Sequence, residues 1–255
     1  MTPFDKVIVA LVPALFLAAC GGGNDDDLDD RLDLADPKVR LLHAVPLAPD
    51  VSLYRNDAAV GGATDLAYKE ATTYFDVSTA TQKWDVRTTG TPELTVGSVT
   101  FDARRGTKYT LVAVPDAGSV TDVALIADPY NKSIASDNAR VRVFNAAFNT
   151  GSLDVYLTAP GADLATATPN FAAVGYKAAQ PLSGSDSIQL EGSNYQLRMT
   201  TAGTKTVVFD AQVSLARNAD WLIVPVPASV TLNDTKVLVV QTDSDTPAIE
   251  LGSTP

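Results

Sequence analysis

The stretch VRLLHAVPLAPDVSLYR (residues 39–55) returns later in the chain as VRVFNAAFNTGSLDVYLT (residues 141–158). In the first copy Val39 and Leu41 alternate with Arg40, and Val141 and Val143 follow the same alternation in the second. Apolar and charged residues that alternate with period two predict a half-buried β-strand. We therefore expect a β-rich unit that occurs twice, in which the arginines of each first strand point away from the core.

Three further pairs of segments match in the same order along the chain. One of them aligns Trp84 with Tyr195 and Arg87 with Arg198, and the last aligns Tyr109 with Trp221. Chance similarity could imitate one such match but hardly four in sequence, so the chain is interpreted as an internal duplication. The pairs are LAYKEA (66–71) with VGYKAA (174–179), KWDVRTTGT (83–91) with NYQLRMTTAGT (194–204), and RGTKYTLVAVPDAGSVTDVALI (105–126) with RNADWLIVPVPASVTLNDTKVLVV (217–240).

Each copy contains apolar runs and turn signals for about seven strands, the inventory of an immunoglobulin-like or transthyretin-like sandwich of roughly 100 residues. The runs TLVAV (110–114) and LIVPV (222–226) are apolar on both phases, which is typical of a strand covered on both faces. We predict an all-β fold of two tandem β-sandwich domains after a signal peptide and a flexible tether. The expected boundaries are 38–130 and 139–245 for the sandwiches, 131–138 for a linker and 246–255 for a C-terminal tail.

The composition argues against two classes of binding partner. The chain has 255 residues, 45% of them hydrophobic, and a formal net charge of −11. This charge argues against nucleic-acid binding, which needs a basic surface, and against docking onto anionic lipid headgroups. A single cysteine cannot form a disulfide within the chain, so packing alone must hold the domains together.

The first nineteen residues have the composition of an export signal. Lys6 precedes an uncharged run, residues 7–19, that is shorter than the roughly 20 apolar residues of a membrane-spanning helix. Leu17, Ala18 and Ala19 before Cys20 resemble the lipobox of bacterial lipoproteins, which implies recognition by the lipoprotein signal peptidase and acylation of Cys20. Two or more acyl chains anchor a protein stably to a membrane. The alternative is an incidental thiol in a signal peptide that is cut elsewhere.

Residues 20–37 follow as a glycine-rich and then aspartate-rich segment. Like charges at this density repel one another, which favours an extended, solvated tether. A calcium site is the alternative, but the spacing lacks the alternation and the turn glycine of an EF-hand loop. Gly21 stands where an aspartate commonly signals inner-membrane retention in lipoproteins, so we expect a bacterial cell-envelope location at the outer membrane.

The duplicated unit resembles a family of bacterial envelope domains, domain of unknown function 4397. The first copy carries the family's opening pattern in VRLLHAVPLAP and DVSLYRN, and the second keeps RVRV and LDVYLT but has Asn145 where the first has His43. The resemblance extends from residue 38 to about residue 243. It implies a tandem β-sandwich lipoprotein and brings no catalytic residues.

Sequence motifs for chemistry are sparse. His43 is the single histidine and shares the parity of Val39 and Leu41, so we expect it to face inward and to hydrogen-bond the backbone of the turn from Pro46 to Pro49. A catalytic base is the alternative, but Asn145 could not do that work in the second copy. We predict no catalytic residue, metal site or cofactor, since imidazole and thiolate ligands are lacking in number. A carboxylate-based hydrolase remains a lesser alternative.

Aromatic side chains are the remaining candidates for recognition. Matched aromatics in the predicted strands are expected to be core residues. Tyr68 and Tyr176, followed by Lys69 and Lys177, lie in connections and are the predicted binding residues. We expect a non-enzymatic envelope lipoprotein that is held at the membrane through Cys20 and has a structural, adhesive or protein-binding role. The alternative is a polysaccharide-binding module, and the partner is an envelope protein or polysaccharide that the sequence does not identify.

Overall fold

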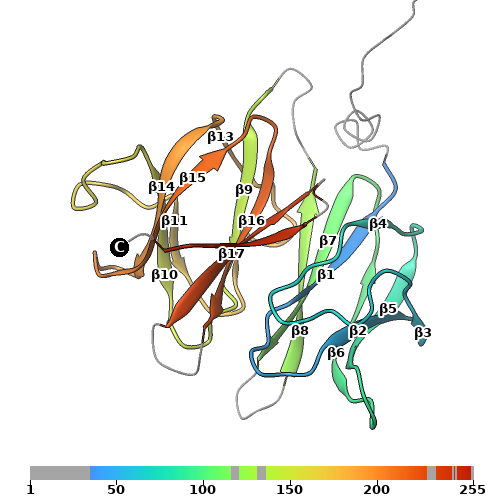
Figure 1. Ribbon diagram of the computed structural model, residues 1–255. Helices are drawn as coiled ribbons and strands as arrows, with labels where there is room; N and C mark the ends of the chain where they lie inside the picture. The colour runs from blue at the N-terminus through green and yellow to red at the C-terminus, as the bar shows by residue number, and fades with distance from the viewer. Residues whose placement is uncertain are drawn as a thin grey trace, which may run out of the picture.

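The computed structural model describes residues 35–115, 121–130, 136–228, 234–242, 244 and 246–253, and every regular element in these ranges is a β-strand (Figure 1). The predicted all-β sandwich fold is confirmed. No helix long and apolar enough to cross a membrane occurs in the part of the chain that the structure describes. The signal peptide, Cys20 and the residues of the tether before Ala35 lie outside the described residues.

The first sandwich consists of two four-stranded sheets. One sheet has the order β4-β1-β7-β8 and the other the order β3-β2-β5-β6. β1 runs parallel to β7, whereas the immunoglobulin order pairs the first strand with the second. The strands are β1 (Lys38–His43), β2 (Val51–Arg55), β3 (Ala58–Ala59), β4 (Phe75–Asp76), β5 (Thr81–Thr88), β6 (Thr95–Asp102), β7 (Thr107–Pro115) and β8 (Thr121–Pro129).

The second sandwich repeats this topology. Its sheets have the orders β12-β9-β16-β17-β18 and β11-β10-β14-β15, and β13 also pairs with β9. Val141 of β9 faces Trp221 of β16, as Val39 of β1 faces Tyr109 of β7. The strands are β9 (Ala139–Phe144), β10 (Leu153–Thr158), β11 (Phe171–Val174), β12 (Ala179–Gln180), β13 (Ile188–Leu190), β14 (Ser193–Thr201), β15 (Val207–Leu215), β16 (Asp220–Pro227), β17 (Thr235–Gln241) and β18 (Ala248–Leu251).

Two details differ from the sequence-based expectations. The segment 246–255, expected as a tail, contributes β18, which pairs with β17 and has no counterpart among the described residues of the first sandwich. The alignment of β5 with β14 is also shifted by two residues: Tyr54 faces Asp85, whereas Tyr156 faces Arg198. A shift of two keeps every side chain on its own face of the sheet, so alternation of apolar residues cannot detect it.

Each sandwich has its own apolar core. In the first, Trp84 and Tyr109 are buried as expected, and in the second Trp221 is buried while Tyr195 packs at the margin of the core. Burial of side chains of this size is the main source of the folding free energy, at roughly 25 cal/mol per Å² of apolar surface.

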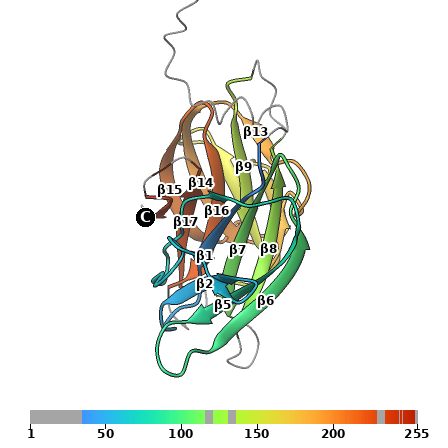
Figure 2. The same cartoon turned by 90° about the vertical axis from the view of Figure 1, so that its right-hand side faces the viewer.

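A third apolar cluster joins the two sandwiches. The sheets β4-β1-β7-β8 and β12-β9-β16-β17-β18, here called the inner sheets, pack face to face (Figures 1 and 2). This explains why TLVAV and LIVPV are apolar on both phases: each of these strands has a core on either side. The buried members of the cluster are Leu42, Ala44, Ala71, Val112, Val114, Ile126, Phe144, Ala146, Ala179, Leu222, Val224, Val226, Leu238 and Val240.

The arginines of the first strands do not lie on a solvated face. Arg40, Arg140 and Arg142 are each at most 3% exposed, because the outward side of each inner sheet is covered by the other sandwich. The interpretation of these strands as half-buried is therefore wrong. Alternation shows which side chains share a face, but it does not show what covers that face.

Candidate functional site

Charged side chains gather at one end of the interface between the inner sheets. The cluster contains four cations and two carboxylates, and both sandwiches contribute to it. Unpaired charges are costly to bury, so the geometry of their pairing determines what the cluster does. Its members are Arg40 in β1, Lys108 in β7, Asp128 in β8, Arg140 and Arg142 in β9, and Asp220 in β16.

Arg140 connects the two carboxylates. Its Nη2 donates to Oδ1 of Asp128 at 2.9 Å and to the carbonyl of Pro129 at 2.7 Å, while Nη1 lies 3.4 Å from Oδ2 of Asp220. Its guanidinium also lies over the ring of Tyr130, at 4.6 Å from the centroid. Because Asp128 and Tyr130 belong to the first sandwich, this residue ties the second sandwich to the first.

Arg142 makes a second connection across the interface. Its Nη2 donates to Oδ1 of Asp128 at 3.0 Å, and its Nη1 donates to the carbonyl of Leu182 at 2.9 Å. It also hydrogen-bonds the carbonyls of Pro181 and Ser185. The loop of the second sandwich that contains these carbonyls therefore lies against β8. There the Gly184 amide donates to the carbonyl of Ala127 at 2.8 Å, which covers the edge of β8.

Arg40 and Lys108 supply the remaining positive charge. Arg40 donates from Nε to the hydroxyl of Thr110 at 2.9 Å and from Nη1 to the carbonyl of Gln241 at 3.2 Å. Nζ of Lys108 lies 4.0 Å from Oδ2 of Asp220 and 4.1 Å from the centroid of the Tyr130 ring. The bond to Gln241 crosses the interface in the opposite direction to the bonds of Arg140 and Arg142.

The electrostatics of the cluster favour an ionised Asp220. Burial by itself would raise the pKa of this carboxyl, but the charges of Arg140, Lys108 and Arg40 and a hydrogen bond from Thr242 lower it below its usual value. The same carboxylates raise the pKa of Arg140 against the effect of its own burial. Both groups are therefore charged in the folded protein, and each depends on the other for compensation.

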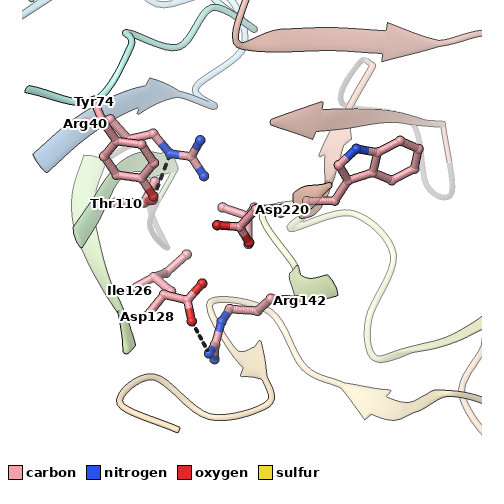
Figure 3. A pocket seen from close by; sticks show the side chains of 9 residues that line it. Arg40, Tyr74, Thr110, Ile126, Asp128, Arg142 and Asp220 are labelled. Atoms are coloured by element: carbon pink, nitrogen blue, oxygen red, sulfur yellow. Dashed lines mark hydrogen bonds and ion pairs between the residues drawn. The ribbon is translucent and has the colours of Figure 1, made fainter. Parts of the chain in front are cut away.

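The space enclosed by the cluster is small. Asp128, Asp220 and Arg40 turn toward the same space, which is also lined by Tyr74 and Arg142 (Figure 3). The free volume is about 10 Å³, close to the minimum that a single water molecule needs. Two carboxylates do converge here, as a hydrolase would require, but the space between them does not admit a sugar or a peptide. Sequence reasoning missed this cluster because its members come from both sandwiches and meet only where the inner sheets pack.

The four predicted binding residues also lie at the interface. The hydroxyl of Tyr68 donates to the carbonyl of Pro227 at the end of β16, and the hydroxyl of Tyr176 donates to the carbonyl of Pro115 at the end of β7. These two bonds are reciprocal, because each tyrosine and each proline has the other as its counterpart in the duplication. Such reciprocity is the geometry of a two-fold interface, here within one chain.

Lys69 and Lys177 add an ion pair beside each tyrosine. Lys69 lies 2.8 Å from Glu250 of β18, and Lys177 lies 3.0 Å from Asp122 of β8. All four residues of the two Tyr-Lys pairs are half-buried. The structure thus brings each predicted pair against the other sandwich, which is an arrangement suited to holding the sandwiches together.

His43 holds the loop after β1, as expected. Its Nδ1 accepts a hydrogen bond from the Val45 amide at 3.2 Å, and its Nε2 lies 3.2 Å from the carbonyl of Pro49. The Val45 amide can only donate, so Nδ1 has no proton and the neutral ring donates from Nε2. Burial lowers the pKa of His43 from 6.5, although the bond to Pro49 and the nearby Asp50 and Glu70 oppose that shift.

Asn145 makes the corresponding bonds after β9. Its Oδ1 accepts from the Ala147 amide at 3.0 Å, and its Nδ2 donates to the carbonyl of Gly151 at 3.0 Å. The partners lie two and six residues downstream in both copies. A further bond at 3.0 Å runs from Nδ2 to the carbonyl of Val174. Histidine and asparagine thus do the same structural work at equivalent positions.

The remaining predicted site residues cannot be placed. Leu17, Ala18, Ala19 and Cys20 lie outside the described residues. Among the residues that are described, no group of three or more histidine, cysteine, aspartate or glutamate side chains is arranged to hold a metal ion.

The fold and the interface define the chain as a duplicated β-sandwich protein whose two copies pack through equivalent sheets. Residues 37–156, just under half of the chain, match the family model described as "Domain of unknown function (DUF4397)", in agreement with the resemblance inferred from the sequence. The match begins just before β1 and ends within β10, so it covers the first sandwich, β9 and the first part of β10. No curated protein matches the chain.

Proposed function

We propose that the protein is a lipid-anchored protein of the bacterial cell envelope that acts as a binding or structural module, not as an enzyme. The observation that carries the proposal is the filled interface between the sandwiches. Apolar side chains and a paired ionic cluster occupy it, and the cavity beside the two carboxylates has about 10 Å³ of free volume. This supports a rigid frame with no room for a substrate where the two copies meet.

The ends of the frame support a role in recognition. Leu47 in the loop between β1 and β2 is 92% exposed, and Leu94 in the hairpin between β5 and β6 is 60% exposed. The amide of Thr89 in this hairpin donates to the carbonyl of Asp50 in the β1–β2 loop at 2.8 Å, so the two loops are neighbours. Loops on a rigid scaffold often carry binding residues, and we assign these two exposed leucines to that role. The partner is an envelope protein.

The sequence supports the proposed lipid anchor. The Leu17–Ala18–Ala19–Cys20 pattern is the basis for a thioether-linked lipid on Cys20, and Gly21 after it is the basis for a location at the outer membrane. A single acyl chain binds a membrane only marginally, so stable anchoring requires the two or more chains of a lipoprotein. The anchor and the binding role can be tested in the same experiment.

The experiment is cross-linking in intact cells followed by mass spectrometry, with the wild-type chain and a Cys20→Ala variant. We expect the wild type in the membrane fraction with reproducible neighbours, and the variant in the soluble fraction without them. A wild-type N-terminus other than an acylated Cys20 would contradict the anchor. To test recognition separately, Leu47→Ser and Leu94→Ser should remove cross-links while the chain stays membrane-bound, and retention of every cross-link would contradict the assigned loops.

A further inference from the structure

The side chain of His43 bonds the backbone of Val45 and Pro49, and we call this unit the His43 corner. Its hydrogen bonds fit a neutral imidazole. The Val45 amide points at Nδ1, and the carbonyl of Pro49 takes the proton of Nε2. A second proton would place an N–H on Nδ1 opposite the N–H of Val45, so two donors would face each other. The side chain is fully buried, and a buried cation without a partner is costly. Protonation therefore requires that the corner opens.

The charged and titratable groups around the ring do not provide a partner at Nδ1. Asp50 follows the loop that His43 holds, and Glu70 precedes β4; each favours protonation by its charge, but burial outweighs both. The ring of Tyr68 meets the imidazole edge to face at 6.1 Å, and Nζ of Lys69 lies 5.4 Å from the centre of that tyrosine ring. β7 places Ala113 beside His43 in the register of the sheet.

The same corner holds the segment that reaches the second sandwich. The amide of Lys69 donates to the carbonyl of His43 at 2.8 Å, and the amide of His43 donates to the carbonyl of Glu70 at 3.0 Å. Tyr68 lies in this segment, and its hydroxyl bonds the carbonyl of Pro227. Movement at the corner is therefore transmitted to both the exposed β1–β2 loop and the contact between the sandwiches.

In the second sandwich the equivalent unit is Asn145 with the backbone of Ala147 and Gly151, here called the Asn145 corner. Its side chain does not titrate. The amide of Lys177 donates to the carbonyl of Asn145 at 2.8 Å, and the amide of Asn145 donates to the carbonyl of Ala178 at 3.1 Å. The asparagine side chain makes its bonds without a charge that depends on pH. The molecule thus contains its own control for the effect of the histidine.

We propose that the His43 corner is an acid-sensitive switch: protonation of the imidazole opens the β1–β2 loop and loosens Tyr68 from the second sandwich, while the Asn145 corner stays closed. The open corner exposes a histidine with an ordinary pKa near 6.5, and the closed corner retains the neutral form below that pH. The ratio of open to closed corners then rises by up to tenfold for each pH unit below about 6.5, or up to about thirtyfold between pH 7.5 and 5.0.

The test is amide hydrogen exchange of the full chain in detergent between pH 7.5 and 5.0, corrected for the intrinsic effect of pH on exchange. The protection of Val45 and Lys69 should fall as the pH falls, while that of Ala147 and Lys177 stays constant. The His43→Asn variant, which places in the first sandwich the residue that the second already has, should abolish the difference. The proposal would be overturned if the ratio of the protection factors of Val45 and Ala147 stayed constant with pH in the wild type. It would also be overturned if the protection of Val45 fell equally in the His43→Asn variant.

A second measurement does not depend on the variant. The imidazole proton resonances of His43, the single histidine of the chain, should titrate with a midpoint below 6.5, at a lower pH than that at which the protection of Val45 begins to fall. A midpoint at or above 6.5 would contradict the closed corner, and so would titration of the ring without any loss of protection.

Discussion

The two sandwiches share a strand order, yet they are alike where they face each other and different where they face away. On the outer sheet of the second sandwich, residues 159–170 lie over the strands: the carbonyl of Ala162 accepts from Arg198 at 2.8 Å and that of Ala167 accepts from Lys205 at 2.6 Å. In the first sandwich the corresponding connection is a short turn at Asn56 and Asp57, and no such segment is present.

The outer face of the first sandwich has a group of ion pairs in place of such a covering segment. Arg87 contacts Asp57 at 2.7 Å, Asp85 at 3.2 Å and Glu93 at 3.2 Å, and its guanidinium stacks on Tyr54 at 4.2 Å. At the inner sheets, in contrast, both copies use a tyrosine against a proline carbonyl and a lysine against an acid. The comparison shows that the contacts made by each Tyr-Lys pair are repeated in both copies at the interface, whereas the contacts on the outer faces differ.

Some equivalent inner positions differ in charge, and Lys108 and Asp220 are such a pair. Lys108 pairs with Lys38 in the register of β7 and β1, and Asp220 pairs with Arg140 in the register of β16 and β9, so Lys108 and Asp220 are counterparts. They meet at 4.0 Å across the interface. Two identical copies would place like charges there. The difference makes one sandwich complementary to the other and disfavours pairing between two first or two second sandwiches.

The largest expected effect is at this pair. Asp220→Ala leaves Arg140, Lys108 and Arg40 buried without their shared carboxylate, and we expect a loss of about 3–5 kcal/mol in the free energy of unfolding by urea denaturation. Asp137→Ala removes an exposed carboxylate that lies 3.9 Å from Arg217, and this control should cost less than about 0.5 kcal/mol. Equal losses in the two variants would contradict this expectation, because the buried Asp220 would then stabilise the protein no more than an exposed ion pair does.

The two sandwiches also differ at Gly97, where β6 and β8 of the first sandwich come into close contact. A Cβ atom on Gly97 of β6 would lie 2.8 Å from the backbone nitrogen of Val123 in β8, whereas Phe209 occupies the equivalent position in β15 and is a core residue. Gly97→Ala should force the two sheets of the first sandwich apart and cost about 1–3 kcal/mol, measured by thermal and urea unfolding. Gly61→Ala, which meets no atom within 4 Å, is the control. A neutral Gly97→Ala would mean that β6 and β8 are not in close contact.

The reciprocal tyrosines give a smaller and matched effect. Tyr68→Phe and Tyr176→Phe each remove one hydroxyl that bonds the opposite sandwich, and each should cost about 0.5–1.5 kcal/mol in urea denaturation. The two losses should agree if the interface has two-fold character. Tyr195→Phe, whose hydroxyl bonds the carbonyl of Glu191 within its own sandwich, serves as the control for losing a hydroxyl elsewhere. A marked loss in only one of the two interface variants would count against the reciprocity.

The lysines beside them should matter least. The pairs of Lys69 with Glu250 and of Lys177 with Asp122 are partly solvated, so Lys69→Met and Lys177→Met should each change stability by less than about 1 kcal/mol and less still at high salt. Urea denaturation at low and high ionic strength measures both quantities. A loss that is large and independent of salt would show that these pairs are more deeply desolvated than their exposure indicates.

Much of the fold could be predicted from the sequence, because alternation and internal repetition are local signals. Val39, Trp84 and Tyr109 are in the core as expected, and His43 and Asn145 share one structural role. The burial of Arg40 and Arg142 could not be predicted, since a sequence pattern gives the parity of a side chain but not the element that covers it. The convergence of Asp128 and Asp220, and the position of Tyr68 and Tyr176 against the other copy, depend on how the two sandwiches pack.

The shared third core also bears on the order of folding. Residues 38–130 are synthesised before β16 and β17, so a completed first sandwich has its inner sheet, with Leu42, Val112 and Arg40 on the open side, uncovered until the second sandwich arrives. An uncovered apolar sheet in a half-made chain is prone to aggregation. We therefore expect the first half, made without the C-terminal half, to aggregate more readily than the full chain.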